Sequence, residues 1–403
     1  MGFKLALCGV GSFGRVFIPL FKAHPGVDEV ALCDLLPDRL AREAELHGVR
    51  RTFASFQEAL RSDVDAVAIF SQRHLHAAHT LEALAAGKHV YCAVPMAHTL
   101  EDIERILEAV RRSGKIYMTG ETSYYYASTV FCRKKFREGA FGPIVHGEAA
   151  YLHDMTHGFY DAFKNSGGAD WKRVAGFPPM FYGTHSLSMI ASVTGARATH
   201  IACLGYRDRH EDDVFRAGAN LWDNPFSNET ALARFSDGST AQLKEHRRVG
   251  WKAGNSVAMS LFGERASFSN QGLAQTWVTL EGKNLDVSKD LLCSKGEAVS
   301  AATGLHEELR RDFYAGYAPV HDRARIPREI AGLHNGHDGS HHFLVDDFVR
   351  AVSQDALPPN HAWAAARYAA PGIVAHESAL RDGAMLPIPD FGEPEAEAKR
   401  LEI

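Results

Sequence analysis

The sequence contains no closely spaced cysteine pair, no long apolar run and no excess of positive charge. Its six cysteines include no CxxC pair, which argues against a zinc cluster or a disulfide framework. No apolar stretch reaches the roughly 18 residues of a transmembrane helix. The apolar residues 3–10 lead directly into a glycine-rich turn, unlike a signal peptide. These absences predict a reduced, cytoplasmic protein with no membrane partner.

The charge balance also excludes a class of partner. The formal net charge of −5 gives no global field that attracts phosphate backbones, so nucleic acid is not an expected partner. We find no internal repeat and no low-complexity tract. With 403 residues, 45% hydrophobic and 23% charged, the chain has the composition of a soluble globular protein with more than one domain.

The first 120 residues alternate short apolar runs with segments of helical period. We expect strands at residues 3–9, 29–34, 66–70, 89–93 and 116–119, and helices at 13–23, 38–47, 74–86 and 100–112. The strand segments are almost continuously apolar, as in a sheet covered on both faces. The alternation therefore predicts an α/β protein whose residues 1–122 form a Rossmann domain with a doubly wound parallel sheet.

A glycine motif stands at the end of the first expected strand. Gly9, Gly11 and Gly14 form a GxGxxG pattern that also contains Ser12 and Phe13. In this context the first glycine allows a tight turn, the second a close approach of pyrophosphate, and the third close packing of helix on strand. A glycine turn without a ligand is the alternative, but its position between strand and helix favours a dinucleotide site.

An acidic residue supports the same interpretation. Asp34 ends the second expected strand, 20 residues after Gly14, where a carboxylate can bind ribose hydroxyls. It repels a 2′-phosphate, and Leu35 and Leu36 follow it rather than an arginine. We therefore expect NAD as the cofactor, while the nearby Arg39 keeps NADP open.

Beyond these features, the chain resembles the Gfo/Idh/MocA family of oxidoreductases. The resemblance rests on the glycine motif, residues 71–76 (SQRHLH), residues 86–92 (AGKHVYC) and Pro95. It implies a Rossmann domain followed by an α/β domain with an open, mostly antiparallel sheet, which often mediates oligomers, and a redox reaction of a sugar or polyol. Further expected cofactor-binding residues lie at later strand ends: Ser71, His74, His76, Val94, Pro95 and Glu121.

The chain departs from the family pattern at two positions. Typical dehydrogenases of the family carry Glu-Lys-Pro after the fourth strand, whereas Val94 stands here at the position of that catalytic lysine. Phe181 also stands where the family has an aspartate four residues before its catalytic histidine, which is His185 here. A valine can neither donate a proton nor stabilise an alkoxide, so the standard dehydrogenation by these residues is not expected.

Other segments resemble one branch of the family, the NAD-dependent glycosidases of the α-N-acetylgalactosaminidase type. That branch has Val-Pro in place of Lys-Pro, a glutamate after the fifth strand, and the segments Tyr-x-His-Asp and Tyr-x-Thr-His. The corresponding residues here are Val94-Pro95, Glu121, Tyr151 to Asp154 and Tyr182 to His185. The acetamido-sugar preference of the branch does not transfer, because the connecting loops differ.

Two Tyr/His pairs are the candidate catalytic residues. In an expected strand at 144–154, Val145, Gly147, Ala149, Tyr151 and His153 would share one face. Tyr182 and His185 are three residues apart at the start of an expected helix at 182–193 and would also share a face. Histidine is a base near neutral pH and tyrosine a proton donor. The alternative is that these side chains serve packing and structural hydrogen bonds.

Other histidines form two groups in the sequence. The first is His74, His76 and His79 at the turn after the third expected strand, where it would approach the cofactor. The second is His334, His337, His341 and His342 beside glycines. Neither has the ligand spacing of a known zinc motif, so we expect no metal.

We expect residues 123–403 to form a substrate-binding and oligomerisation domain. Its expected strands are at 231–235, 240–245 and 257–262, its helices at 343–352 and 362–382, and its long loops at 207–228 and 294–339. The expected function is NAD-dependent hydride transfer at a ring hydroxyl carbon of a carbohydrate or glycoside, by a homo-oligomer. The alternatives are an NAD-recycling glycoside hydrolase and a non-catalytic NAD-binding sensor.

Overall fold

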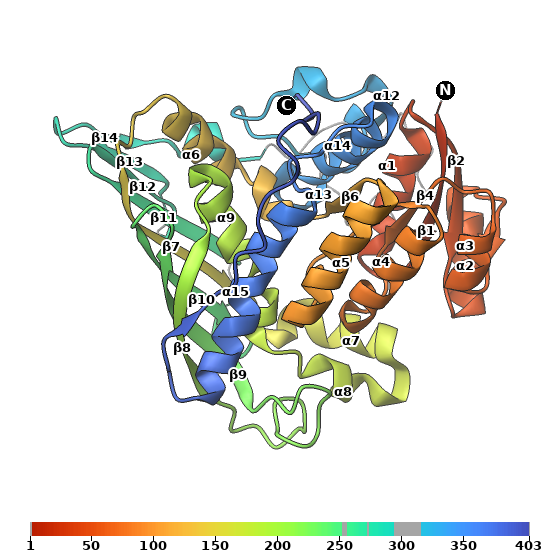
Figure 1. Ribbon diagram of the computed structural model, residues 1–403, viewed down its shortest axis with the longest axis horizontal. Helices are drawn as coiled ribbons and strands as arrows, with labels where there is room; N and C mark the ends of the chain where they lie inside the picture. The colour runs from red at the N-terminus through yellow and green to blue at the C-terminus, as the bar shows by residue number, and fades with distance from the viewer. Residues whose placement is uncertain (1, 252–255, 272–273, 294–315, 403) are drawn as a thin grey trace. The chain divides into compact units, whose positions relative to one another are not determined.

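The computed structural model describes residues 2–251, 256–271, 274–293 and 316–402 (Figure 1). The chain divides into two compact units. The first consists of Met1–Tyr126, Leu292–Ala365 and Gly392–Ile403, and the second of Ala127–Leu291 and Ala366–Phe391. This division differs from the expected boundary after residue 122, because two later segments of the chain join the first unit.

The first unit is built on a six-stranded sheet in the order β3-β2-β1-β4-β5-β6. Its strands are β1 (Phe3–Cys8), β2 (Val27–Cys33), β3 (Thr52–Phe53), β4 (Ala66–Ile69), β5 (His89–Cys92) and β6 (Tyr117–Thr119). Every neighbouring pair in this sheet is parallel. The predicted doubly wound parallel sheet is confirmed, with the two-residue β3 as an addition.

The helices between these strands follow the expected alternation, except that the short helix at Phe56–Arg61 was not predicted. They are α1 (Ile18–Ala23), α2 (Pro37–His47), α3 (Phe56–Arg61), α4 (His76–Ala85) and α5 (Leu100–Ser113). The side chain of Thr99 caps α5 by accepting the amide N–H of Asp102 at 3.1 Å, and α5 ends at Gly114 with φ 64°. Capping and an apolar face that is buried on successive turns explain why this segment is helical.

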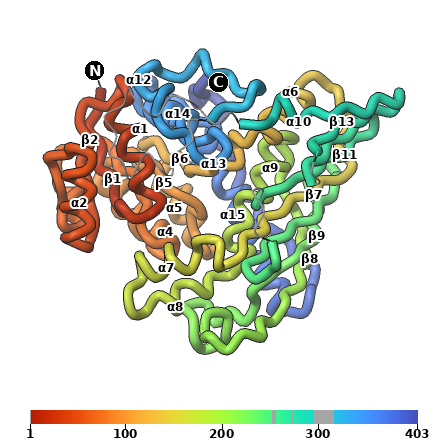
Figure 2. The backbone as a smooth tube through the Cα atoms, turned by 180° about the vertical axis from the view of Figure 1, so that it is seen from behind, coloured from red at the N-terminus to blue at the C-terminus, as the bar shows by residue number. Residues whose placement is uncertain are grey.

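A late helix completes the core of the first unit. Helix α14 (His341–Gln354) packs beside α1, as both views show (Figure 1 and Figure 2). The ring of Phe348 in α14 lies 6.3 Å from those of Phe3 and Phe21 and 5.7 Å from that of Tyr91. These edge-to-face contacts bury apolar surface of the first strand, first helix and fifth strand, which is why the late segment belongs to this unit.

The same late segment contains short helical turns. They are η8 (Arg323–Arg325), α12 (Arg328–Ala331) and α13 (Gly336–Gly339), and they occupy part of the loop expected at 294–339. Residues 294–315 of that prediction lie outside the described residues. The other long loop is confirmed, since it connects two neighbouring strands of the second unit between residues 207 and 226.

The second unit is built on a nine-stranded sheet in the order β14-β13-β12-β11-β7-β10-β9-β8-β15. Only β7 and β10 pair in parallel; the other pairs are antiparallel. The strands are β7 (Ile144–Leu152), β8 (Ala198–Arg207), β9 (Phe226–Phe235), β10 (Thr240–His246), β11 (Val257–Gly263), β12 (Ala266–Ser269), β13 (Thr276–Thr279), β14 (Asn284–Asp286) and β15 (Leu386–Pro387). The expected open, mostly antiparallel sheet is confirmed.

Helices cover one face of this sheet. Helix α9 (Thr184–Thr194) packs on β7, β10 and β11, and α6 (Ala127–Arg137) packs on α9 (Figure 1). A Cβ at Gly147 would lie 2.9 Å from a side-chain carbon of Ile190, so the absence of a side chain there allows the close approach of α9. The remaining helices with residues in this unit are α7 (Tyr160–Gly167), α8 (Trp171–Ala175), α10 (Ser288–Leu291) and α15 (Ala362–Leu380).

Apolar side chains remain exposed on alternate positions of the strands. They include Val145 of β7, Leu204 of β8, Leu232 of β9, Phe262 of β11 and Val278 of β13. The exposure of Val145 corrects the expectation that it shares a face with Gly147, Ala149 and Tyr151, which are buried. The register between β7 and β11 shifts at this end of the strand, and such a bulge reverses the alternation locally.

The described residues contain no helix with both the length and the apolar character of a membrane span.

Candidate functional site

The expected cofactor-binding residues gather at one edge of the six-stranded sheet. Gly9, Asp34, Ser71, Val94 and Glu121 follow β1, β2, β4, β5 and β6 within two residues. In a parallel sheet these carboxyl ends lie on the same edge. The strand order reverses between β1 and β4, and ligands of doubly wound sheets bind at such a reversal.

The glycine-rich turn has the geometry of a phosphate cradle. Gly9 has φ 97°, and a Cβ there would lie 2.6 Å from the carbonyl of Phe70. A Cβ on Gly14 would lie 2.0 Å from the Gly9 carbonyl oxygen, whereas one on Gly11 would meet only an Arg39 nitrogen at 3.8 Å. Gly9 and Gly14 are therefore required by the chain itself, and the space at Gly11 fits a bound pyrophosphate.

The helical turn that follows begins in a different form from the one expected. A 3-10 turn, η1 (Gly14–Phe17), precedes α1, within the helix predicted at 13–23. Ser12 is exposed and Phe13 is half-buried at the start of this turn. Amide groups at such a helical N-terminus attract anions.

Asp34 links the end of β2 to the glycine turn. Its buried carboxylate accepts the amide N–H of Val10 at 3.0 Å and that of Leu36 at 2.9 Å. Arg39 lies 3.7 Å from the same carboxylate. A carboxylate has about four acceptor sites, so Asp34 retains the capacity to bind the ribose hydroxyls of a dinucleotide.

The first histidine group supports the turn after β4. Both ring nitrogens of the fully buried His76 face backbone carbonyls, Pro95 O at 2.8 Å and Ser71 O at 3.0 Å. Burial lowers the pKa of His76 to about 4, although these two carbonyls act in the opposite direction. His79 lies 3.0 Å from Ser71 Oγ. His76 therefore holds the turn, and of these histidines the half-buried His74 is the better candidate for a cofactor contact.

Val94, Pro95 and Glu121 lie at the ends of the last two strands. The peptide bond between Val94 and Pro95 is cis, and both residues are buried. The Glu121 carboxylate accepts the amide N–H of Ser123 at 2.9 Å, which caps the turn η3 (Thr122–Tyr125). The buried carboxylate of Glu121 thus has a structural role in addition to the predicted cofactor contact.

The second histidine group also lies at the nucleotide turn. The rings of His337 and His341 lie 5.3 and 5.8 Å from that of Phe13, and His341 Nε2 lies 2.9 Å from His337 Nδ1. His334 and His342 are buried in the same segment, where His342 Nε2 lies 3.0 Å from His334 O. Within the described residues no group of three or more histidine, cysteine or acidic side chains has the arrangement of a metal site.

The second unit brings together the two predicted Tyr/His pairs. The Tyr151 ring lies 5.9 Å from that of Tyr182 and 5.1 Å from that of His185, and the last two rings are 5.0 Å apart. Tyr182 ends the turn η6 (Pro179–Tyr182) rather than starting α9, because Pro178 and Pro179 begin a separate turn. The three rings form a compact group of a base and two phenols, which we call the tyrosine–histidine cluster.

His153 extends this cluster toward the following turn. Its ring lies 5.3 Å from that of Tyr151 and stacks on Phe159 at 4.1 Å. Burial, followed by the charges of Arg247 and His157, lowers the pKa of His153 to about 3. The imidazole is therefore neutral at physiological pH and a weak proton acceptor.

Two charged residues of the site were not predicted from the sequence. Arg247 places its guanidinium carbon 4.8 Å from the Tyr151 ring centre and 5.7 Å from that of Tyr182. It donates to Glu245 at 2.8 Å, and both residues are buried. The sequence did contain a signal for them, the alternation of strand β10. Glu245 and Arg247 continue the series of buried alternate residues that begins with Ala241 and Leu243.

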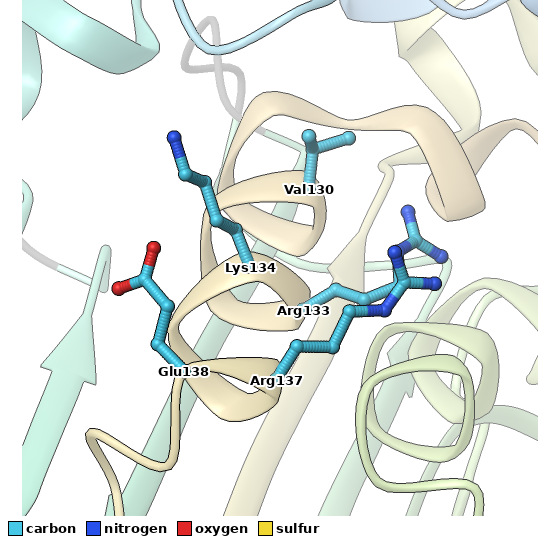
Figure 3. A pocket seen from close by; sticks show the side chains of 5 residues that line it. All are labelled: Val130, Arg133, Lys134, Arg137 and Glu138. Carbon is cyan, nitrogen blue, oxygen red and sulfur yellow. The ribbon is translucent and has the colours of Figure 1, made fainter.

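A surface pocket elsewhere in the second unit contains none of the predicted site residues. It has a volume of about 350 Å³ and is lined by Val130, Arg133, Lys134, Arg137 and Glu138. Figure 3 shows Arg133 and Arg137 on one side of α6 and Lys134 and Glu138 on the other. Basic side chains in the last turn of a helix complement its dipole, which explains the charges of this pocket without a ligand.

Comparison with known families identifies the first domain. A family described as "Oxidoreductase family, NAD-binding Rossmann fold", Gfo/Idh/MocA, matches residues 3–121. This range contains β1 to β6, the glycine turn and Asp34. This match confirms the expectation of NAD as the cofactor.

Curated relatives carry the name glycosyl hydrolase family 109 protein. One from Porphyromonas gingivalis is 29% identical over 180 residues, which cover 42% of this chain and 38% of that protein. One from Streptomyces filamentosus is 22% identical over 427 residues, covering 96% of this chain and 77% of that protein. The chain thus spans about two fifths of the first relative and about three quarters of the second.

Solved structures extend the likeness to the whole chain. Levoglucosan dehydrogenase in complex with NADH and levoglucosan has a TM-score of 0.69 at 16% identity, covering 96% of this chain and 100% of that one. The myo-inositol 2-dehydrogenase from Lactobacillus plantarum has a TM-score of 0.69 at 18% identity, with the same coverage. At identities this low, the structural likeness establishes the fold alone. The chain therefore shares its fold with these two dehydrogenases, and its residues 3–121 match the NAD-binding Rossmann domain of the Gfo/Idh/MocA oxidoreductase family.

Proposed function

We propose that this protein is an NAD-dependent oxidoreductase that acts at a ring hydroxyl carbon of a carbohydrate or glycoside. The observation that carries the proposal is the tyrosine–histidine cluster, in which Tyr151, Tyr182 and His185 lie within 5.0 to 5.9 Å of one another. Oxidation of an alcohol requires a proton acceptor for the hydroxyl group, and a histidine between two phenols supplies one. The sugar substrates of the structural neighbours support the same class.

Different residues of the chain bind the cofactor and transfer the proton. The turn at Gly11 would hold the pyrophosphate of NAD, and Asp34 its ribose hydroxyls. NAD, when bound, supplies the acceptor for the hydride of the sugar carbon. His185 takes the hydroxyl proton, and Tyr182 orients the hydroxyl group by a hydrogen bond. Because the side chain of Val94 can neither donate nor accept a proton, we assign proton transfer to His185 and Tyr182.

A glycosidase form of the reaction is the second candidate. Its support is Tyr151 beside His153, the Val94 departure and the names of the curated relatives. Oxidation makes a ketone that acidifies the neighbouring C–H, a base removes this proton, and the aglycone leaves from the anomeric carbon. Water then adds and the hydride returns. Because His153 is a weak base and Arg247 lies against the Tyr151 ring, Tyr151 is the better candidate for proton removal.

One assay distinguishes the two forms. Purified protein with NAD is incubated with free sugars and with aryl glycosides, while aglycone release and NADH absorbance are followed together. NADH in proportion to a consumed free sugar supports the dehydrogenase, and aglycone release without net NADH supports the glycosidase. A protein that binds NAD and sugar but is silent in both channels, and that keeps its ligand response after His153→Ala and His185→Ala, would instead be a sensor.

We also propose that the exposed face of the nine-stranded sheet pairs with a second copy of the chain. Leu204 and Leu232 are 63% and 57% exposed on neighbouring strands, and contiguous apolar surface of this kind favours association. Light scattering should show an oligomer that Leu232→Lys dissociates. Leu380→Lys, at a residue 53% exposed at the end of α15, is the control and should leave the oligomer intact. A wild-type monomer would contradict this proposal.

We propose a cytoplasmic location as well. All six cysteines are free and five of them are buried, as expected for a protein that stays in a reducing compartment. Cell fractionation should recover the protein with cytosolic markers, and recovery with periplasmic or secreted proteins would contradict the proposal.

A further inference from the structure

A buried glutamate lies beside Tyr151 of the tyrosine–histidine cluster, on the neighbouring strand. Glu245 in β10 is in register with Tyr151 in the parallel neighbour β7, so the two side chains lie on the same face of the sheet. Helix α9 packs on that face. Ser186, the residue after His185, donates its hydroxyl to the Glu245 carboxylate. Glu245 therefore contacts the helix that carries the candidate base.

Arg247 compensates the charge of Glu245 and reaches the phenols. It donates to Glu245 at 2.8 Å, and to the carbonyl oxygens of Tyr151 and His246 at 3.2 Å each. The central carbon of its guanidinium group lies over the Tyr151 ring, 4.8 Å from the ring centre. A buried cation in this position attracts the ring and favours negative charge on it. Arg247 thus couples the carboxylate to Tyr151.

Side chains from three neighbouring elements and from its own segment face Glu245. His185 and Ser186 face it from α9, Tyr151 from β7 and Arg247 from its own strand. From β9 the register partner is Glu229, whose carboxylate accepts the Met180 amide at 2.7 Å and lies 2.7 Å from His376 Nδ1. The environment of Glu245 thus combines one cation, one titratable base and a second buried carboxylate.

We propose that Glu245 and Arg247 are positioning residues of the reaction: the carboxylate holds Arg247 against Tyr151 and, when ionised, stabilises the positive charge that His185 gains from the substrate proton. The inference rests on the proposed function, because His185 must accept a proton from the substrate. An ionised Glu245 stabilises the imidazolium that this step creates, and a protonated Glu245 does not. Activity should therefore depend on the proton carried by Glu245.

The direction of that dependence follows from the burial of the carboxyl group. Burial raises the pKa of Glu245 to about 7, against the opposing effects of Arg247, Ser186 and His185. The carboxyl group becomes charged as the pH rises through neutrality. The rate of proton transfer should increase over the same interval.

The test compares the pH profile of kcat in the full chain with three substitutions. Wild type should show an ascending limb near pH 7. Glu245→Gln removes the charge and keeps the size, so the limb that Glu245 causes should disappear and kcat above pH 8 should fall about tenfold, which corresponds to a loss of about 1.4 kcal/mol of transition-state stabilisation. Glu245→Asp should restore the limb. Glu229→Gln, the matched loss of a buried carboxylate that faces His376 instead, should retain it.

A second measurement separates failure of this inference from failure of the proposed function. NMR signals of the Tyr151 ring, which need no substrate, should shift with an inflection near pH 7 in wild type as Glu245 ionises beside Arg247, and Glu245→Gln should abolish this shift. Turnover with an unchanged pH limb and an unchanged pH response of the Tyr151 ring in Glu245→Gln would overturn the inference and leave the proposed function standing. A pH response of the Tyr151 ring that depends on Glu245, in a protein without any turnover, would contradict the proposed function and leave this inference standing.

Folding is checked by thermal unfolding of each variant. If Glu245→Gln does not fold, Ser186→Ala provides the alternative, because loss of a hydrogen bond to the charged form raises the pKa of Glu245. The ascending limb should then move to higher pH. A limb that stays in place in a folded Ser186→Ala protein would contradict the inference.

Discussion

At the scale of single residues, His185 is the side chain on which the proposed chemistry depends most. It is buried, and its ring meets those of Tyr151 and Tyr182 at 5.1 and 5.0 Å. The sequence predicted that Tyr182 and His185 share a face, because that is a local property. That Tyr151, about 30 residues earlier in the chain, joins them was expected from the family resemblance and from no local pattern, since this contact depends on the packing of α9 on β7.

We predict that His185→Ala lowers kcat about 10²- to 10⁴-fold, the usual contribution of a general base. NAD affinity, measured by fluorescence titration, should stay within about twofold, because the Rossmann domain is unchanged. His146→Ala is the control: this histidine is on the same strand as Tyr151 but bonds to Thr240, and the substitution should preserve kcat. Equal losses in both variants would exclude His185 as the base.

Asp34 allows a prediction for the cofactor. Asp34→Ala removes the acceptor of the Val10 and Leu36 amides and the carboxylate available to the ribose. NAD should bind about tenfold more weakly, since a hydrogen bond to a charged group is worth about 1.5–3 kcal/mol. The preference for NAD over NADP should also narrow, because a 2′-phosphate is no longer repelled. Calorimetric titration with both dinucleotides measures the two effects, and an unchanged ratio of affinities would contradict this role of Asp34.

The roles of some residues could not be predicted from the sequence, for a physical reason. His76 stood among the expected cofactor contacts, but both its ring nitrogens face backbone carbonyls in the fully buried turn. Arg247 and Glu245 were overlooked because charged residues in a strand are usually solvated. In both cases the role depends on burial, which is set by the rest of the fold.

At the scale of helices and strands, prediction succeeded where the signal is local. The cap of α5 by Thr99 and its end at Gly114 agree with the sequence pattern. The separate turn η6 was missed because the helix prediction extended back to Tyr182, although Pro178 and Pro179 stand just before it. The bulge at Val145 was missed because strand alternation carries no information about a register shift with β11.

The C-terminus of α14 provides a test of local strain. Asp355 ends this helix with φ 48° and ψ 58°, a left-handed conformation. Asp355→Gly should raise the free energy of unfolding by about 0.5–1 kcal/mol, because glycine adopts this conformation without steric cost. Gln354→Gly, one residue earlier and inside the helix, should lower it by about 1 kcal/mol. Chemical denaturation measures both, and destabilisation by Asp355→Gly would contradict the assignment.

At the scale of the whole molecule, the class of both sheets was predictable and the division of the chain was not. Alternating strands and helices predicted the parallel sheet without any long-range information. The return of α14 to the first unit rests on contacts of Phe348 with Phe3 and Phe21, more than 300 residues apart in sequence. No local pattern encodes such a contact.

Buried neutral histidines make the stability of the fold depend on pH. Burial lowers the pKa of His76 to about 4, below the value near 6.5 of an unfolded histidine. Between these values the unfolded chain binds more protons, so stability is complete above about pH 6.5 and falls as the pH drops toward 4. A fully buried group of this kind contributes roughly 3 kcal/mol.

We therefore predict that the unfolding temperature falls as the pH is lowered from 6.5 to 4, and that His76→Gln reduces this dependence. The exposed His210, whose ring nitrogen lies 3.1 Å from Asp208, provides the control, since His210→Gln should leave the dependence unchanged. A flat profile in wild type would contradict this account.

The most direct test of the central claim is a stopped-flow measurement at 340 nm. Protein saturated with NAD is mixed with an excess of the sugar or aryl glycoside on which it turns over. We predict a rise in NADH absorbance within the first turnover, whether the hydride is later released as NADH or returned to the sugar, and its loss in His185→Ala. Turnover of the substrate with no absorbance change at any time would contradict hydride transfer and therefore the proposed function.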